Sequence, residues 1–123
     1  MSIKARLYHN PMCSKSRAAV ASLCKHGIEY EEIRYLETPP SVEDLVQICQ
    51  ILNCHATDII RHEEVLFQAM GLSLTDDRDH QAWLEVLHKH PKLIQRPIVI
   101  IDNRGVIARP VELIESLLTD LNQ

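Results

Sequence analysis

The sequence predicts an α/β fold in which a parallel β-α-β unit and a β-hairpin contribute strands to one sheet. Apolar and charged residues alternate over residues 3–8, as in a half-buried strand. Apolar residues then recur at helical spacing over residues 14–26, and Gly27 is a natural helix stop. Residues 28–35 predict a second strand, and the β-branched run at 97–101 predicts a buried one. A strand, a helix and a strand in so few residues indicate a right-handed parallel crossover.

The middle of the chain has no strand pattern and predicts a block of helices. It follows a proline break at residues 37–40, where Ser41 is typical of a helix N-cap followed by acidic residues. A helix is predicted over residues 42–52. Three further helical segments are predicted at residues 56–61, 63–70 and 78–88. We therefore expect an inserted helical subdomain at about residues 41–90.

The C-terminal part of the sequence predicts a β-hairpin and a final helix. The turn is expected at residues 102–105, with Gly105 well placed for a positive φ, and the strand returns over 106–108. Pro110 is suited to the first position of the last helix. The order β-α-β, helical block, β-β-α is that of a thioredoxin-like fold. We expect residues 1–123 to form a single domain of this kind.

Composition limits the classes of function. A chain of 123 residues suits one domain with a real core. A formal net charge of −4 and an aromatic content of 4% argue against nucleic acid or anionic membrane as a partner. No apolar run approaches the roughly 18 residues that span a bilayer, and no signal peptide is expected. We expect a cytoplasmic monomer whose cysteines are reduced.

Cys13 lies where the first strand should give way to the first helix. A cysteine there meets the positive end of the helix dipole and several free backbone N–H groups, and both favour the thiolate. Its polar neighbours predict that it is exposed. His9 is expected either to assist the thiolate or only to cap the loop, and Ser16 to donate a hydrogen bond to the sulfur. We interpret Cys13 as a nucleophile, with His9 and Ser16 as its catalytic partners.

The motif around Cys13 holds one thiol. Without a second cysteine at position 16, no disulfide can form within the motif, so the expected chemistry is an adduct or mixed disulfide that an outside thiol resolves. Cys24, Cys49 and Cys54 are interpreted as structural. The spacing of cysteines and histidines matches no zinc site, so neither a metal nor a bound cofactor is predicted.

Three arginines stand out by their placement. Arg61 follows an apolar pair, Arg96 precedes Pro97, and Arg109 ends the second strand of the predicted hairpin. Arginine offers forked donors that keep their charge, which suits a tetrahedral oxyanion. The hairpin should bring Arg96 and Arg109 to one end of the sheet. We predict that the three bind a small oxyanion, with a solvated surface position as the alternative for each.

Together these motifs resemble the glutathione/glutaredoxin-linked arsenate reductase family, ArsC. The residues that carry the resemblance are His9-Asn10-Pro11-Met12-Cys13, Ser16-Arg17, Arg61, Leu93-Ile94-Gln95-Arg96-Pro97-Ile98-Val99 and Arg109-Pro110. The resemblance implies a thioredoxin-like fold and attack of Cys13 on arsenate, with glutathione as co-substrate and glutaredoxin as partner. It also implies that the three arginines hold the oxyanion and that Pro97 is a cis-proline facing Cys13.

One departure from the family pattern follows Cys13. Arsenate reductases of the family carry Gly-Thr where this chain has Ser14-Lys15, so the chain resembles a Cys-Ser-Lys-Ser-Arg sister group. Glycine lets the backbone approach an oxyanion closely, whereas Lys15 adds charge. Two other functions stay open: a thioredoxin-like adaptor that binds another protein, and a glutathione-dependent disulfide reductase without oxyanion chemistry. The three arginines favour arsenate reduction over disulfide reduction.

Overall fold

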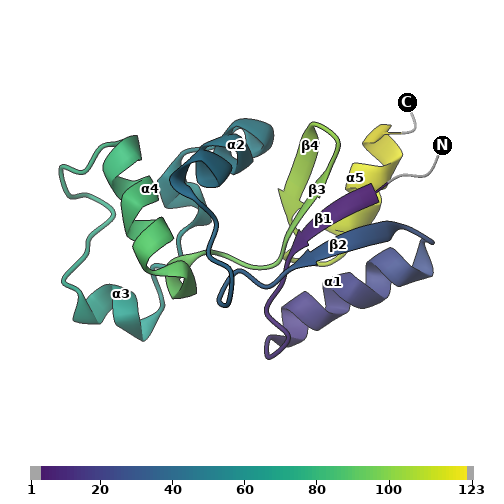
Figure 1. Ribbon diagram of the computed structural model, residues 1–123, viewed down its shortest axis with the longest axis horizontal. Coiled ribbons are helices and arrows are strands. Elements are labelled where there is room, and N and C mark those ends of the chain that lie inside the picture. Colours follow the sequence, from purple (N-terminus) through teal and green to yellow (C-terminus); the bar gives the residue numbers. More distant parts are fainter. Residues whose placement is uncertain (1–3, 122–123) are drawn as a thin grey trace. The chain divides into compact units, whose positions relative to one another are not determined.

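The computed structural model describes residues 4–121, which form two compact units (Figure 1). Residues 4–38 and 96–121 make a sheet unit, and Pro39–Gln95 make a helical unit. The elements of the sheet unit are β1 (Lys4–Tyr8), α1 (Ser14–Lys25), β2 (Glu29–Ile33), β3 (Ile98–Ile101), β4 (Arg104–Ile107) and α5 (Leu113–Leu121). The predicted order β-α-β followed by β-β-α is therefore confirmed.

The sheet has the strand order β2-β1-β3-β4. β1 pairs in parallel with β2, and its last residue Tyr8 lies opposite Ile33. β1 pairs antiparallel with β3, so that Tyr8 also lies opposite Ile98, and Ile98 in turn lies opposite Ile107 of β4. The segments that follow β1, β2 and β4 and the segment that precedes β3 therefore meet at one edge of the sheet. Residues 9–13 and Arg96 belong to that edge.

The core of the sheet unit explains why the strands and helices form where they do. All four residues of β3 are buried, as the unbroken β-branched run predicts. Alternate residues of β1 and β3 pack with one face of α1 and of α5. The buried cluster consists of Ala5, Leu7, Ala19, Leu23, Val99, Ile101, Ala108, Ile114 and Leu117. Burial of an aliphatic side chain of this size contributes about 1.5–3 kcal/mol, so this cluster fixes the position of α1 and of its N-terminus.

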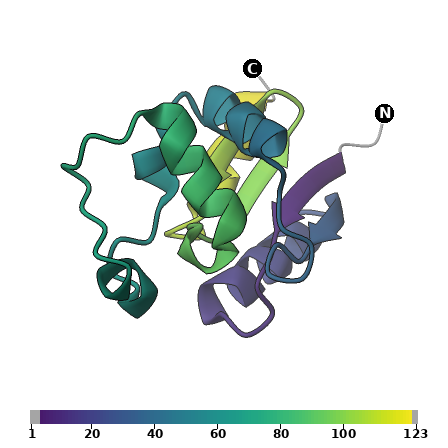
Figure 2. The ribbon, with the colours of Figure 1, turned by 60° about the vertical axis from the view of Figure 1, so that its left-hand side comes forward.

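The helical unit contains α2 (Val42–Leu52), α3 (Val65–Ala69), α4 (His80–Lys89) and two 3₁₀ turns, η1 (Ala56–Ile59) and η2 (Pro91–Leu93). α2 lies beside α4 (Figure 2). Ser41 caps α2 as predicted, because its side chain accepts from the Asp44 N–H while Asp44 accepts from the Ser41 N–H. The prediction of a purely helical block is wrong in one respect, because an antiparallel β-bridge joins Ile60 to Ile94. Both residues are buried, so this pairing satisfies backbone groups that water cannot reach.

Two details of the C-terminal half differ from the sequence prediction. The hairpin turn is Asp102-Asn103, and Asp102 takes the positive φ of 55° that was expected of Gly105. Gly105 instead pairs with Ile100 inside β4. The last helix begins at Leu113 rather than at Pro110, because Leu113 N–H first closes a tight turn onto the Pro110 carbonyl. The peptide bonds Arg96–Pro97 and Arg109–Pro110 are both cis.

Within residues 4–121, none of the helices is long and apolar enough to cross a membrane.

Candidate active site

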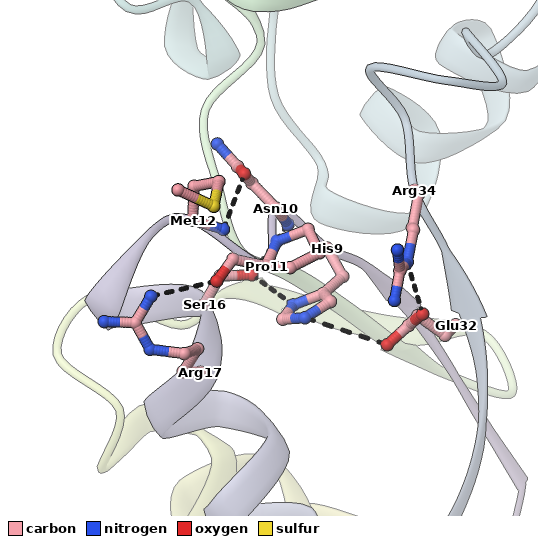
Figure 3. Close-up of polar contacts among 8 residues, drawn as sticks. All are labelled: His9, Asn10, Pro11, Met12, Ser16, Arg17, Glu32 and Arg34. Atoms are coloured by element: carbon pink, nitrogen blue, oxygen red, sulfur yellow. Dashed lines mark hydrogen bonds and ion pairs between the residues drawn. The ribbon is translucent and has the colours of Figure 1, made fainter.

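The loop after β1 holds Cys13 at the N-cap of α1. The backbone turns at Pro11, where Cys13 N–H donates to the Asn10 carbonyl at 3.0 Å and Met12 N–H donates to Asn10 Oδ1 at 3.0 Å. The Arg17 side chain donates to the Pro11 carbonyl at 2.9 Å (Figure 3). Cys13 has extended backbone angles and starts the helix by accepting from Arg17 N–H. The predicted position of Cys13, between the first strand and the first helix, is therefore confirmed.

The pKa of Cys13 lies below its ordinary value, although burial acts in the opposite direction. Burial raises this pKa, but three donors to the sulfur outweigh it: the backbone N–H of Ser16, the side chain of Arg96 and the backbone N–H of Lys15. The positive charge of Arg96 lowers the pKa further. The backbone N–H groups of Lys15 and Ser16 are among the free N–H groups that an α-helix presents at its N-terminus. Cys13 is half-buried rather than exposed as predicted.

Arg96 is the arginine that the structure places against Cys13. It immediately precedes the cis-proline Pro97, which leads into the buried strand β3. Its guanidinium lowers the pKa of Cys13 both as a hydrogen-bond donor and by its charge, while its buried Nε has no hydrogen-bond partner among residues 4–121. A buried donor without an acceptor costs about 1–3 kcal/mol, and more when the group is charged. Arg96 therefore holds an unused donor next to the thiol, as an anion site requires.

His9 and Ser16 form a buried pair beneath the loop. His9 is 4% exposed and Ser16 is fully buried. The Nδ1 atom of His9 lies 2.6 Å from Ser16 Oγ, and Asn10 N–H donates to the same oxygen at 3.0 Å (Figure 3). His9 Nε2 lies 3.7 Å from a carboxylate oxygen of Glu32. Nδ1 thus faces Ser16 and Nε2 faces Glu32. His9 therefore influences Cys13 through Ser16.

The pKa of His9 lies below its ordinary value. Burial is the main cause; the Glu32 carboxylate opposes it, and the nearby charges of Arg34 and Arg17 add to it. The lowered pKa favours the neutral imidazole, which can carry its proton on Nδ1 or on Nε2. With the proton on Nε2, His9 faces Glu32 as a donor and Nδ1 can accept from the Ser16 hydroxyl. Ser16 acts on the pKa of Cys13 through its backbone N–H, and a hydrogen bond from its hydroxyl to the sulfur stays a prediction.

Glu32 and Arg34 are parts of this site that the sequence analysis missed. Arg34 Nε donates to Glu32 Oε2 at 2.7 Å, and the other oxygen of the same carboxylate faces His9. The parallel pairing of β1 with β2 contained the signal, since the register places Glu32 opposite Leu7, two residues before His9. A pocket of about 270 Å³ lies beside this network, between the loop 9–12 and residues 34–37.

The other two predicted oxyanion residues differ in their surroundings. Arg109 follows β4, where Ala108 N–H donates to the Pro97 carbonyl, so the hairpin does bring it to the same end as Arg96. Its side chain is exposed. Arg61 belongs to the helical unit, where it pairs with Glu64 at 3.1 Å and donates to the Lys92 carbonyl at 3.3 Å. Binding of an oxyanion by either arginine stays a prediction.

The sheet, the helix-capping cysteine and the cis-proline beside it define a thioredoxin-like protein with one activated thiol in its motif. Residues 8–117 match the ArsC family. The chain is 38% identical over 114 residues to an arsenate reductase of Neisseria meningitidis serogroup A, covering 92% of this chain and 97% of that protein. It is 32% identical over 117 residues to an arsenate reductase of Escherichia coli K12, covering 93% and 80%. The chain therefore belongs to the ArsC family.

Solved structures agree with this assignment. The structure of an arsenate reductase from Vibrio cholerae superimposes with a TM-score of 0.84 and 37% identity, covering 94% of this chain and 98% of that one. The predicted thioredoxin-like α/β fold is thereby confirmed.

Proposed function

We propose that the protein is an arsenate reductase in which Cys13 is the nucleophile. One observation carries the proposal: Arg96 lowers the pKa of Cys13, and its buried Nε has no hydrogen-bond partner in the described part of the chain and can donate to an anion. The thiolate supplies the attacking electron pair, and the donors around it suit an oxyanion. Membership of the ArsC family and the similarity to proteins named arsenate reductase support arsenate as that oxyanion.

In the proposed reaction, the Cys13 thiolate attacks the arsenic atom of arsenate. A sulfur–arsenic bond forms and one oxygen leaves as water after protonation. A glutathione thiolate then attacks the Cys13 sulfur, and the electron pair of the sulfur–arsenic bond stays on arsenic, which leaves as arsenite. Cys13 is left in a mixed disulfide with glutathione, which glutaredoxin reduces. Arsenic gains two electrons, and the two sulfurs supply them.

Each residue of the site has a role in this proposal. Arg96 binds the arsenate oxygens, and Arg61 and Arg109 are further donors to them. Ser16 and His9 position the loop, because Ser16 Oγ accepts from Asn10 N–H and lies 2.6 Å from His9 Nδ1, and the Ser16 N–H lowers the pKa of Cys13. The glutathione route is supported by the motif itself, since the residue one turn after Cys13 is a serine and offers no second thiol.

The test is an NADPH-oxidation assay with arsenate, glutathione, glutaredoxin and glutathione reductase. We expect the wild-type protein to support turnover, Cys13→Ser to reduce it to background, and Cys24→Ser, which removes an exposed thiol of the same helix, to leave it unchanged. Ser14→Gly tests the family departure, and a higher rate would show that Ser14 limits access of the oxyanion. If wild-type protein gives only background with arsenate but reduces a glutathionylated peptide through Cys13, the disulfide reductase alternative replaces this proposal.

A further inference from the structure

Two cysteines that the proposed mechanism does not use meet at the C-terminal end of α2. The helix ends at Asn53, whose backbone is left-handed with φ 54° and ψ 51°. Asn53 N–H donates to the Gln50 carbonyl at 3.1 Å, and Cys54 N–H donates to the Cys49 carbonyl at 2.9 Å. This pair of hydrogen bonds is a Schellman motif, which brings together the side chains of the residues five apart that its longer bond joins. Here those residues are Cys49 and Cys54.

The two thiols act on each other: a hydrogen bond between their side chains raises the pKa of Cys49 and lowers that of Cys54, as expected when Cys49 is the donor. Both cysteines are free thiols. Cys49 is 3% exposed, whereas Cys54 is half-buried. Solvent therefore reaches the pair at Cys54 and hardly at Cys49. Two apolar residues would satisfy the same motif, so the backbone alone does not require a dithiol at this place.

The surroundings keep both thiols protonated. Burial is the main cause that raises the pKa of Cys49 to about 12, and the neighbouring Cys54 and Asp58 add to it. Burial also raises the pKa of Cys54, with Asp58 adding to it and the donated Cys49 S–H opposing it. Thiol–disulfide exchange needs a thiolate, so this pair is a poor redox couple near neutral pH. A ligand that reacts with two neutral S–H groups and loses water suits it better.

The pair offers two sulfur ligands, and this number limits which metal ion or other centre it can bind. Among residues 4–121 no group of three or more His, Cys, Asp or Glu side chains is placed to hold a metal ion, so a zinc site is not available to the pair. Soft, thiophilic centres prefer sulfur ligands. Trivalent arsenic is such a centre, and it forms stable compounds with two sulfurs and one oxygen.

We propose that Cys49 and Cys54 form a dithiol site for trivalent arsenic compounds. Arsenous acid would react with both thiols to give a cyclic dithioarsenite that keeps one hydroxyl, and two water molecules leave. Two sulfur–arsenic bonds form, two arsenic–oxygen bonds break, and arsenic stays trivalent throughout. The choice of ligand rests on the proposed function, because arsenite is the product of that reaction. The site itself is separate from Cys13 and does not use its chemistry.

The test measures binding of arsenite and of phenylarsine oxide to protein that carries Cys13→Ser, so that the active-site thiol cannot contribute. Intact-protein mass spectrometry should show one arsenical bound with loss of water, and the melting temperature should rise. Adding Cys54→Ala should weaken binding roughly 100-fold, since the second thiol then no longer acts at high effective concentration. Adding Cys24→Ala, which removes a single exposed thiol, should change nothing.

Two outcomes would overturn the proposal: no arsenical on the Cys13→Ser protein, or equal binding with and without Cys54. Cys49→Ala should weaken binding as Cys54→Ala does. Because Cys49 is buried, its variant is compared with Cys54→Ala after circular dichroism has confirmed folding. Reductase activity is measured separately on wild-type protein. Its absence would reject the proposed function and leave the binding result as it stands.

Discussion

Cys13 lies at the N-terminus of α1, whereas Cys49 and Cys54 lie at the C-terminus of α2. The pKa values of the thiols at the two places are shifted in opposite directions. Cys13 is the N-cap residue of α1, where backbone N–H groups and Arg96 lower its pKa below the ordinary value. Cys49 lies in the last turn of α2, and its pKa is raised to about 12. Burial acts to raise the pKa of both thiols. At Cys13 the backbone N–H groups of the helix N-terminus and Arg96 outweigh it, whereas at Cys49 burial is the main cause and Cys54 and Asp58 add to it.

The largest expected effect is the difference in alkylation between Cys13 and Cys49. The pKa of Cys13 lies below its ordinary value, whereas burial raises that of Cys49 to about 12, so a much larger fraction of Cys13 is thiolate at pH 7. The lower nucleophilicity of the more acidic thiolate offsets part of this advantage, and we expect Cys13 to be labelled about 10-fold faster or more. Peptide mapping after limiting iodoacetamide measures both rates in one sample. Faster labelling of Cys49 would contradict the comparison.

Removing Arg96 should bring Cys13 closer to an ordinary thiol. In Arg96→Ala the sulfur loses a charge-assisted hydrogen bond of about 1.5–3 kcal/mol, so the pKa of Cys13 should rise. Labelling increases with pH until the thiol is ionised, so its profile should move to higher pH. The arsenate concentration that half-protects Cys13 should increase about 10-fold or more. Arg104→Ala, which removes an exposed arginine of β4, is the matched control. An unchanged profile in Arg96→Ala would show that the backbone N–H groups suffice.

The smallest expected effect concerns Glu32. Its carboxylate raises the pKa of His9 against the effect of burial, so Glu32→Gln should lower that pKa further. The change is followed by NMR titration of the His9 ring, with Glu31→Gln, an exposed neighbour on the same strand, as control. Cys13 labelling should change only a few-fold, because Glu32 acts on it through His9 and Ser16. If the His9 titration does not move, the 3.7 Å contact between Nε2 and Glu32 has no electrostatic consequence.

The sequence predicted those features that depend on local patterns. Alternation gave β1, helical spacing gave α1, and Ser41 marked the first residue before α2. Features that depend on tertiary register were harder to see. Glu32 looks like any charged residue of an exposed strand until the parallel pairing places it near His9. Gly105 looks like a turn residue, but the register of β3 and β4 puts the turn one step earlier.

The site shows the same division. The place of Cys13 before a helix followed from the chain, since the break at Pro11 and the polar residues after it are local signals. The role of the Ser16 hydroxyl could not be predicted from the sequence, because a serine in the first turn of a helix can donate to the sulfur or to any neighbour. Only the folded structure shows that His9 Nδ1 lies 2.6 Å from Ser16 Oγ. Cys49 and Cys54 are five residues apart in the sequence, and this spacing alone does not show that they meet. The left-handed backbone of Asn53 in the structure brings them together in a Schellman motif.

The hydrogen bonds of the loop before α1 have a consequence for how such a protein can diverge. Asn10, Met12 and Cys13 each donate their N–H inside the loop or to Ser16, so the entropy of ordering this segment is lost when the chain folds and not when a ligand arrives. The side chains of Ser14 and Lys15 are exposed and take no part in these hydrogen bonds. Substitutions at these two positions can therefore alter what approaches the sulfur without disturbing the backbone that ionises it.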